Sequence, residues 1–218
     1  MRAKFRDTII GLTLVFRLTL VRFVLAMVAL LFVCSCYNSD TTNESQQGYI
    51  VSYLQSSHSP TLIPESEVED TIDEEPAFYS TFGTFAYRYI ATYYDEGRDA
   101  KAEITSTSRV AITFEIYPTS NGSVSSSTLP SYTNNSYFES SYIAAGLTPT
   151  YWDFTPLEFT IGDGTFLESV DECLVGCRQD DRVEIYLTCN MAYGNNVIGL
   201  IDEESALLVI CVIDNVEN

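Results

Sequence analysis

The stretch from Pro156 to Ile213 constrains the fold most, because its hydrophobic period changes several times within a short length of chain. Residues 156–162 alternate between apolar and polar side chains, a pattern that is typical of a short, half-buried strand. Gly162 follows directly and is expected to end this strand. A chain that switches so quickly between periods must form several short elements that pack on one another.

A helix is expected after the turn at Asp163 and Gly164. Thr165 and Glu168 have the spacing of a capping box, in which each side chain bonds to the backbone at the start of a helix. One apolar stripe follows at spacings of three, four and three residues, made by Leu167, Val170, Leu174 and Cys177. The pattern predicts a single amphipathic helix that ends near Gly176.

Beyond this helix the hydrophobic period becomes two, which predicts strands. Residues 182–188 alternate strictly, 192–196 form a turn-rich loop, and 206–213 make a last, continuously apolar strand. Residues 87–92 and 110–116 alternate in the same way earlier in the chain. The sequence therefore predicts a sheet of several strands and one packed helix.

The last predicted strand is apolar on both faces. An antiparallel sheet with one face in water would carry polar residues there, so the second face needs a cover. It is formed by Leu208, Ile210 and Val212. Tyr49, Ile50, Tyr53 and Leu54 recur at helical spacing and predict a short amphipathic helix that could provide this cover. A protein partner is the alternative.

Several of these residues match a known family. Phe159, Ile161 and Gly162 are followed in register by Phe166-Leu167, Val170, Glu172, Val183, Ile185 and Ala192-Tyr193-Gly194, and later by Leu200-Ile201 and Leu207. Upstream stands Tyr137-Phe138-Glu139-Ser140-Ser141. This pattern resembles the FKBP-type peptidyl-prolyl cis-trans isomerases over roughly residues 85–214. The resemblance implies an α+β fold in which an antiparallel β-sheet wraps around one α-helix.

The resemblance also implies a site. The matching catalytic positions are Phe138, Glu139, Leu167, through its backbone N–H, and Tyr193, through its hydroxyl. The matching substrate-binding positions are Phe114, Phe159, Phe166, Val170, Leu200, Ile201 and Val209. Four of these residues depart from the family pattern. Val170 replaces the usual tryptophan, Phe114 a tyrosine, Glu139 an aspartate and Val209 an aromatic residue, so weak or altered isomerase activity is expected.

Two functions follow from this resemblance. The first is peptidyl-prolyl cis-trans isomerisation that assists the folding of extracytoplasmic proteins, without a cofactor and with proline-containing polypeptides as clients. The second is a non-catalytic binding or chaperone lipoprotein of the same fold with a degenerate pocket. A closed apolar pocket between Phe138, Phe166 and Tyr193 would favour the isomerase, and a flat or filled site would favour binding alone.

The amino-terminal segment has the features of a secretory signal. Basic residues precede an apolar run that ends Val33-Cys34-Ser35-Cys36. The run after Arg22 is shorter than the about 20 residues that cross a bilayer. The ending resembles a bacterial lipobox, which implies cleavage after residue 35 and lipidation of Cys36. An uncleaved anchor is the alternative, and either version predicts an extracytoplasmic, membrane-anchored protein of a bacterial envelope.

The remaining chain divides by composition. Residues 36–82 are expected to form a polar tether, a short helix and an acidic linker, and 83–218 the FKBP-like domain with a Ser-rich loop insertion at 118–136. The acidic run at 65–75 has no glycine, which a Ca²⁺-binding loop would need for its turn. We therefore interpret this run as a solvated linker.

Charge and composition exclude several other functions. The formal net charge is −19, and without residues 1–35, which carry a net +4, it is −23. A body this acidic is not expected to bind nucleic acid or anionic lipid. The chain has a single histidine, His58, which argues against a histidine-based catalytic triad and against a histidine-rich metal site. Cys173, Cys177, Cys189 and Cys211 could be core thiols or include a disulfide such as Cys177 with Cys211.

Overall fold

The computed structural model describes residues 41–70, 75–119, 122–125, 127–147 and 153–218. The described residues from Thr42 to Asn218 form the second of the two units into which the chain divides. The predicted leader and Cys36 lie outside the described residues. All the strands described below belong to the second unit.

The strands are β1 (Ile63–Pro64), β2 (Phe78–Phe82), β3 (Ala86–Ile90), β4 (Arg109–Thr119), β5 (Tyr132–Thr133), β6 (Leu157–Thr160), β7 (Arg182–Leu187) and β8 (Ala206–Glu217). Strands β3, β4, β6, β7 and β8 fall close to the predicted positions, whereas β1, β2 and β5 were not predicted, and β5 lies within the predicted loop insertion. The helices are residues 41–56, α2 (Glu139–Ala144) and α3 (Glu168–Leu174), with 3-10 turns η1 (Glu65–Asp70), η2 (Arg98–Ala100), η3 (Ser136–Phe138) and η4 (Cys189–Met191). The predicted boundary at residue 83 lies between β2 and β3.

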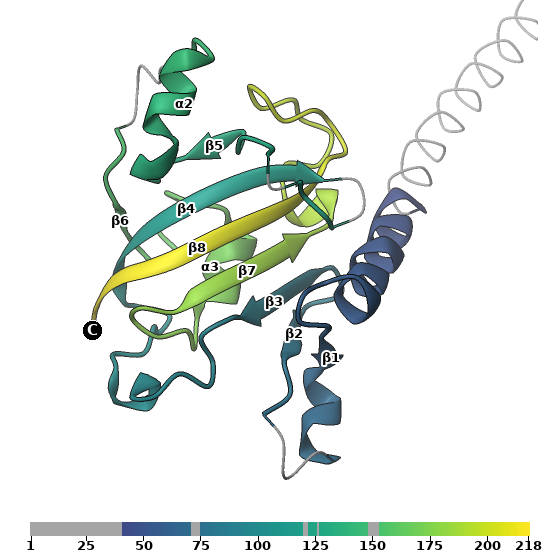
Figure 1. Ribbon diagram of the computed structural model, residues 1–218, viewed down its shortest axis with the longest axis vertical. Coiled ribbons are helices and arrows are strands. Elements are labelled where there is room, and N and C mark those ends of the chain that lie inside the picture. Colours follow the sequence, from purple (N-terminus) through teal and green to yellow (C-terminus); the bar gives the residue numbers. More distant parts are fainter. Residues whose placement is uncertain (1–40, 71–74, 120–121, 126, 148–152) are drawn as a thin grey trace, which may run out of the picture. The chain divides into compact units, whose positions relative to one another are not determined.

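Within the described part of the chain the strands form one mixed sheet in the order β1-β2-β3-β7-β8-β4-β5 (Figure 1). Every pairing is antiparallel except that of β1 with β2. β4 is shared, because β6 pairs with its first half and β5 with its second half on the edge away from β8. The long strands β4 and β8 pair along their whole length, and α3 packs on the inner face of the sheet. This is the predicted α+β fold.

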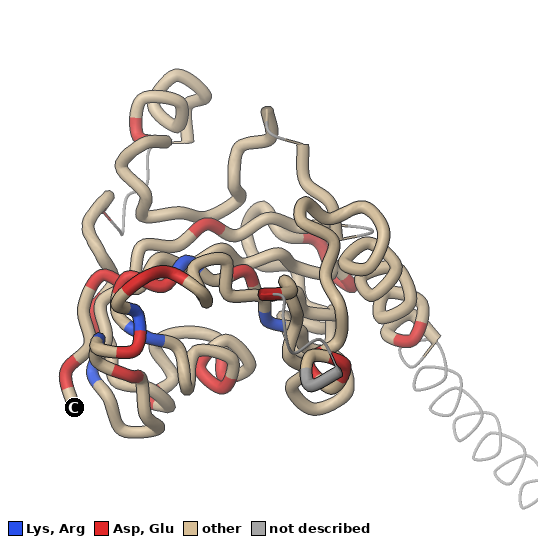
Figure 2. Tube along the Cα trace, turned by 60° about the horizontal axis from the view of Figure 1, so that its bottom comes forward, with Lys and Arg blue, Asp and Glu red and all other residues tan. Residues whose placement is uncertain are grey.

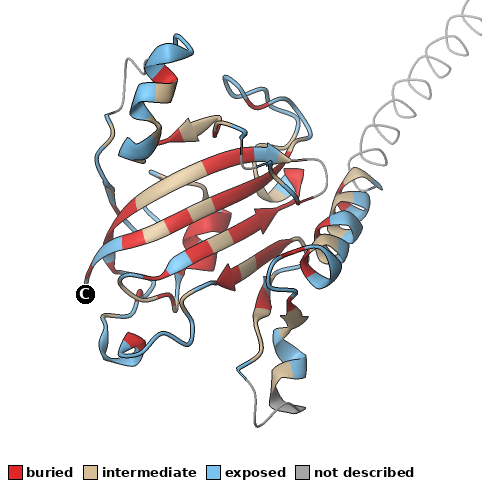
Figure 3. Ribbon diagram, in the orientation of Figure 1, coloured by how far each residue is buried: buried red, intermediate tan, exposed pale blue. Residues whose placement is uncertain are grey.

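The inner face of the sheet holds the main hydrophobic core, which is buried around α3 (Figure 3). Val170 and Leu174 of α3 are completely buried against β7 and β8, where Val183, Ile185 and Val209 point inward. Alternation along the strands brings these side chains to one face. The side of β8 opposite to Leu208 and Ile210, with Leu207, Val209, Cys211 and Ile213, belongs to this core. Burial of the cluster is the main source of its stability.

The outer face has its own core, and the helix at residues 41–56 covers part of it. Ile50 and Leu54 are buried against the outer side chains of β3, β7 and β8, including Leu208. The prediction that this segment covers the sheet is confirmed for the end of β8 near Leu208. Ile210 is only partly buried at the edge of this cluster, and Val212 is half-exposed.

The start of α3 differs from the prediction. The N-cap residue is Leu167, in an extended conformation (φ −67°, ψ 128°) and without a side-chain cap, so the capping box at Thr165 and Glu168 is wrong. The N–H of Thr165 instead bonds to Asp163 Oδ1 at 2.8 Å, because the loop after Gly162 is closed by an Asp-centred turn. The carbonyl of Leu167 accepts the first helical bonds, from the N–H groups of Val170 and Asp171.

The four described cysteines are free and buried, so no disulfide joins Cys177 to Cys211. Burial raises the pKa of Cys173 to about 12 and that of Cys177 to about 11, because a thiolate would lose its hydration in the core. These thiols behave as small hydrophobic side chains. They belong to the core around α3 rather than to a reactive site.

Candidate functional site

One cavity of about 1160 Å³ opens beside the centre of the sheet. It lies between β4 and β5 on one side and the segments 153–158, 165–166 and 193–198 on the others. Its lining residues are Phe114, Ile116, Tyr132, Asn134, Asp153, Thr155, Pro156, Leu157, Glu158, Thr165, Phe166, Tyr193 and Ile198. Most of its surface is apolar, and it is an open groove rather than a closed pocket.

Aromatic rings form one wall of this cavity. Phe114 on β4 and Phe166 before α3 lie with ring centroids 5.1 Å apart and tilted planes. Phe159 of β6 stacks on Phe166 at 6.0 Å, but it is buried behind that ring and does not line the cavity. The turn at 163–165 returns the chain from β6 so that Phe166 covers Phe159. Such a wall can enclose an apolar ring of a ligand.

Tyr193 lines the cavity from the loop after η4. It is half-buried, and burial, together with the nearby Tyr132, raises the pKa of its phenol. Among the described residues its hydroxyl has no hydrogen-bond partner, whereas its carbonyl accepts bonds from Asn196. A neutral phenol of this kind is an available hydrogen-bond donor beside two phenylalanine rings.

A second donor stands at the start of α3. The backbone N–H of Leu167, next to the cavity-lining Phe166, bonds to no acceptor among the described residues. Its extended conformation as the N-cap leaves this N–H outside the helical ladder. The site therefore offers one side-chain donor and one backbone donor near its aromatic wall.

Other residues implied by the resemblance lie elsewhere. Phe138 and Glu139, at the junction of η3 and α2, do not line the cavity; Phe138 packs on Tyr137, with ring centroids 5.1 Å apart, and Glu139 is exposed. Val170, Ile201 and Val209 are buried in the core, and Leu200 is 53% exposed on its loop. The structure thus brings together Phe114, Phe166 and Tyr193 of the expected site, with Leu167 beside them.

The loss of aromatic residues at positions 170 and 209 explains part of this difference. Two valines, Val170 and Val209, are completely buried in the core between α3 and the sheet and do not line the groove. The cavity accordingly has no aromatic floor at these two positions, and it opens sideways toward β5 and residues 153–158.

That side of the cavity contains residues that sequence reasoning missed. Asn134 is buried, and its side-chain amide joins β4 to the rim: Oδ1 accepts the N–H of Phe114 at 2.7 Å, and Nδ2 donates to the carbonyls of Ile112 and Thr155, each at 2.9 Å. No periodic pattern marks this residue, because it lies in the polar stretch that reads as a loop insertion. The only available signal was a run of polar residues broken by Tyr132.

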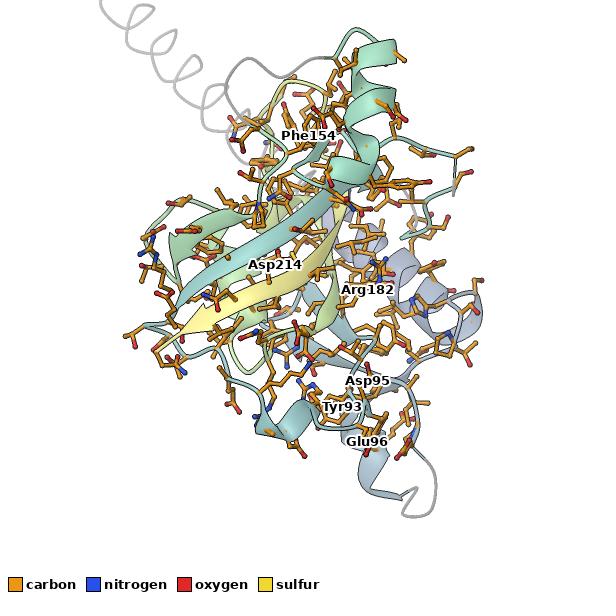
Figure 4. All side chains as sticks on the ribbon, turned by 60° about the vertical axis from the view of Figure 1, so that its left-hand side comes forward. Tyr93, Asp95, Glu96, Phe154, Arg182 and Asp214 are labelled. Carbon is orange, nitrogen blue, oxygen red and sulfur yellow. The ribbon has the colours of Figure 1, made fainter. Side chains whose placement is uncertain are left out.

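The rim beside α2 is fixed by a second aromatic pair. Tyr142 is buried in α2 and donates its hydroxyl bond to the carbonyl of Pro130. Its ring meets Phe154 edge-on at 6.0 Å. Figure 4 shows Phe154 at one end of the domain and Tyr93, Asp95 and Glu96 at the other. Helix α2 therefore supports the segment that carries Asp153 and Thr155.

The polar groups of the groove are mostly acceptors. Two carboxylates, Asp153 and Glu158, stand among the lining residues, which include no basic side chain. Arg109 pairs with Glu158 at 2.6 Å from outside the groove. Acidic segments outnumber basic ones along the trace as a whole (Figure 2). The described residues hold no cluster of three or more side chains that could bind a metal ion.

The sheet wrapped on one helix and the aromatic groove at the start of that helix define an α+β class of protein with an open apolar groove. The sequence model of one family, the FKBP-type peptidyl-prolyl cis-trans isomerases, matches residues 101–210, which is half of the chain. The chain belongs to this family, and the prediction from the sequence is confirmed. No curated protein matches it.

Proposed function

We propose that this protein catalyses cis-trans isomerisation of Xaa-Pro bonds in polypeptide clients outside the cytoplasm. Rotation about such a bond faces a barrier of about 18–20 kcal/mol, which comes from the resonance of the amide. Catalysis needs neither a nucleophile nor a cofactor. It needs a site that holds the proline ring away from water and favours the twisted amide, in which charge separation is lost.

The observation that carries this proposal is the hydroxyl of Tyr193, which has no hydrogen-bond partner among the residues that the structure describes and lies beside the rings of Phe114 and Phe166. The rings supply an apolar wall for a proline side chain, and the hydroxyl can donate to a carbonyl next to the rotating bond. The N–H of Leu167, which has no acceptor in the described part of the chain, provides a second donor for the peptide backbone. The family membership of residues 101–210 supports the same reaction.

We place the protein at a membrane outside the cytoplasm on the sequence of its leader. The basic start, the short apolar run and the lipobox-like ending support lipidation of Cys36. Among the residues that the structure describes, no helix combines the length and hydrophobicity that crossing a bilayer requires. Metabolic labelling with a radioactive fatty acid tests this anchor: wild-type protein should take up label, and Cys36→Ser should not.

The test of catalysis is the exchange rate of a short Xaa-Pro peptide, measured by NMR with protein lacking residues 1–36. Tyr193→Phe removes one hydroxyl and keeps the ring, so kcat/KM should fall by about three- to tenfold, the value of one hydrogen bond. Tyr93→Phe is the matched control, because Tyr93 is a partly exposed tyrosine at the far end of the domain (Figure 4). Equal rates for both variants would contradict the role of Tyr193.

Non-catalytic binding remains the second candidate, and one observation favours it. The groove is open and has no aromatic floor, because Val170 and Val209 are buried in the core. A proline ring would therefore make fewer contacts than in a closed pocket. If folded wild-type protein binds the Xaa-Pro peptide without accelerating its exchange, the chain is a binding module with the FKBP fold.

A further inference from the structure

The side-chain amide of Gln46 bridges two distant points of one loop. Its Nε2 donates to the carbonyl of Glu204 at 2.7 Å, and its Oε1 accepts the N–H of Cys189 at 2.8 Å. Both contacts join the helix at residues 41–56 to backbone atoms, and the partner types fix the orientation of the amide. Gln46 thus holds together the two ends of the segment 189–204.

This segment is the loop that carries the site. Tyr193 and Ile198 both line the cavity from it. Its backbone closes on itself through several bonds, which include Gly194 N–H to the carbonyl of Cys189 at 2.8 Å, Glu204 N–H to the carbonyl of Gly194 at 2.8 Å, and Ile198 N–H to the carbonyl of Ile201 at 2.9 Å. Gln46 closes the same loop from outside.

Asn43 reinforces this contact one helical turn earlier. Its side chain is buried, and Oδ1 accepts the N–H of Asn190 at 3.2 Å and the thiol of Cys189 at 3.5 Å. The two amides therefore satisfy consecutive backbone N–H groups at the start of η4, which would otherwise lack partners at the beginning of a helical turn. No other segment supplies these bonds among the described residues.

We propose that Gln46 is a positioning residue that fixes loop 189–204 so that Tyr193 presents its hydroxyl to the groove. Gln46 lies outside residues 101–210, the part of the chain that the family model matches. The amino-terminal extension is then part of the functional site and not only a tether. The catalytic readout rests on the proposed function, whereas the effect on the loop does not.

Gln47 provides a matched control. It is the neighbouring glutamine on the same helix, and its Nε2 donates to the carbonyl of Thr84 at 3.1 Å, in the turn between β2 and β3. Gln46→Ala and Gln47→Ala thus remove the same group from adjacent positions, and only the first contacts the loop. Gln46→Glu separates the two bonds, because a carboxylate still accepts from Cys189 and no longer donates to Glu204.

The first measurement is hydrogen–deuterium exchange with residue resolution on folded protein. Gln46→Ala should raise exchange by about tenfold at Cys189, Gly194 and Glu204, because two bonds that close the loop are lost. Gln47→Ala should leave these amides unchanged. In Gln46→Glu, Cys189 should keep its protection, because its N–H still has an acceptor. The N–H of Glu204 bonds to the carbonyl of Gly194 and not to Gln46, so it should exchange faster only because the loop is no longer held at the Glu204 carbonyl. Unchanged exchange in Gln46→Ala, or an equal rise in both alanine variants, would overturn the proposal.

Peptide kinetics then test the positioning itself. A loop that is competent for only a fraction of the time raises KM, so Gln46→Ala should show a KM about threefold higher or more, with kcat nearly unchanged. Tyr193→Phe should instead lower kcat, since it removes a contact to the rotating amide. Faster loop exchange with unaltered KM would overturn the positioning role. If wild-type protein has no isomerase activity, the proposed function fails. The positioning role of Gln46 is then tested by calorimetry, in which Gln46→Ala should bind the peptide more weakly than wild-type protein.

Discussion

The two faces of the sheet are built from different chemistry. The inner face is packed with aliphatic side chains and thiols around α3, nearly all from the part of the chain that the family model matches. The outer face is packed largely with tyrosines, Tyr79, Tyr87, Tyr89, Tyr117 and Tyr186, under a helix that precedes that part. One domain thus combines an inner core of aliphatic side chains with an outer layer whose tyrosines can also form hydrogen bonds.

Polar contacts hold the outer layer together. His58 is buried between the extension and the sheet, where its Nε2 lies 3.0 Å from Glu184 Oε2. Tyr186 donates to the same oxygen at 2.7 Å, and the ring of Tyr89 meets His58 edge-on at 5.1 Å. The cluster around α3, by contrast, is made of buried aliphatic side chains, Phe159 and thiols. The outer layer should therefore respond to pH more strongly than the inner one.

The largest expected effect tests whether the outer layer contributes as much to the free energy of unfolding as the inner core does. Leu54 in the helix and Leu174 in α3 are both completely buried, so replacing either by alanine should leave a cavity and lower the free energy of unfolding by about 2–5 kcal/mol. Urea denaturation measures both variants. Tyr49→Ala, on the exposed side of the same helix, should change stability by less than about 0.5 kcal/mol.

The outcome decides how the extension is attached. Comparable losses for Leu54→Ala and Leu174→Ala would make the helix a structural part of the domain. A loss near that of Tyr49→Ala would instead show that the outer layer detaches without cost to the sheet.

The sequence predicts most of the fold because its pattern of burial is periodic. Strands β3, β4 and β7 fall where side chains alternate, and β8 falls where the chain is continuously apolar. The apolar outer side of β8 indicates that Leu208 needs a cover. The start of α3 is less predictable. Several polar residues there compete for the same backbone N–H groups, and Asp163 rather than Thr165 closes the turn.

The site is harder to predict, since it depends on contacts between segments that are far apart in the sequence. Tyr193 and Phe166 follow from the family resemblance, but Asn134 and Gln46 act through single side-chain bonds to distant backbone atoms. Neither bond leaves a periodic trace in the sequence. Val170 is buried in the core and does not reach the groove. Such burial depends on the packing around the side chain, which the pattern of residue types does not reveal.

An intermediate effect is expected for Val170→Trp, which restores the residue type that this position usually carries in the family. Val170 is completely buried in the inner core, so the larger ring should overpack it and lower the free energy of unfolding by about 1–3 kcal/mol. Denaturation and peptide exchange rates should be measured together. A variant that keeps its stability and gains activity would show that the groove extends to position 170.

The smallest expected effect is the pH response of the outer layer. Burial alone would lower the pKa of His58, but its two ring nitrogens face two acceptors, the carboxylate of Glu184 and the carbonyl of Pro60, and these bonds raise the pKa above its usual 6.5. Burial alone would raise the pKa of Glu184, and the bonds from His58 and Tyr186 outweigh it and lower the pKa below 4.5. Only the imidazolium can donate to both acceptors.

The sign of the pH dependence follows from these two shifts. The stability contributed by His58 is complete below pH 6.5 and is lost as the pH rises through its raised pKa, whereas that of Glu184 is complete above pH 4.5 and is lost as the pH falls. Wild-type protein should therefore exceed His58→Ala in unfolding free energy by about 1 kcal/mol more at about pH 6 than at about pH 9. Leu174→Ala should show the same deficit at both values, because an inner-core leucine has no proton to exchange. If the difference in unfolding free energy between wild-type protein and His58→Ala is also independent of pH, the outer layer, like the inner core, is held by packing alone.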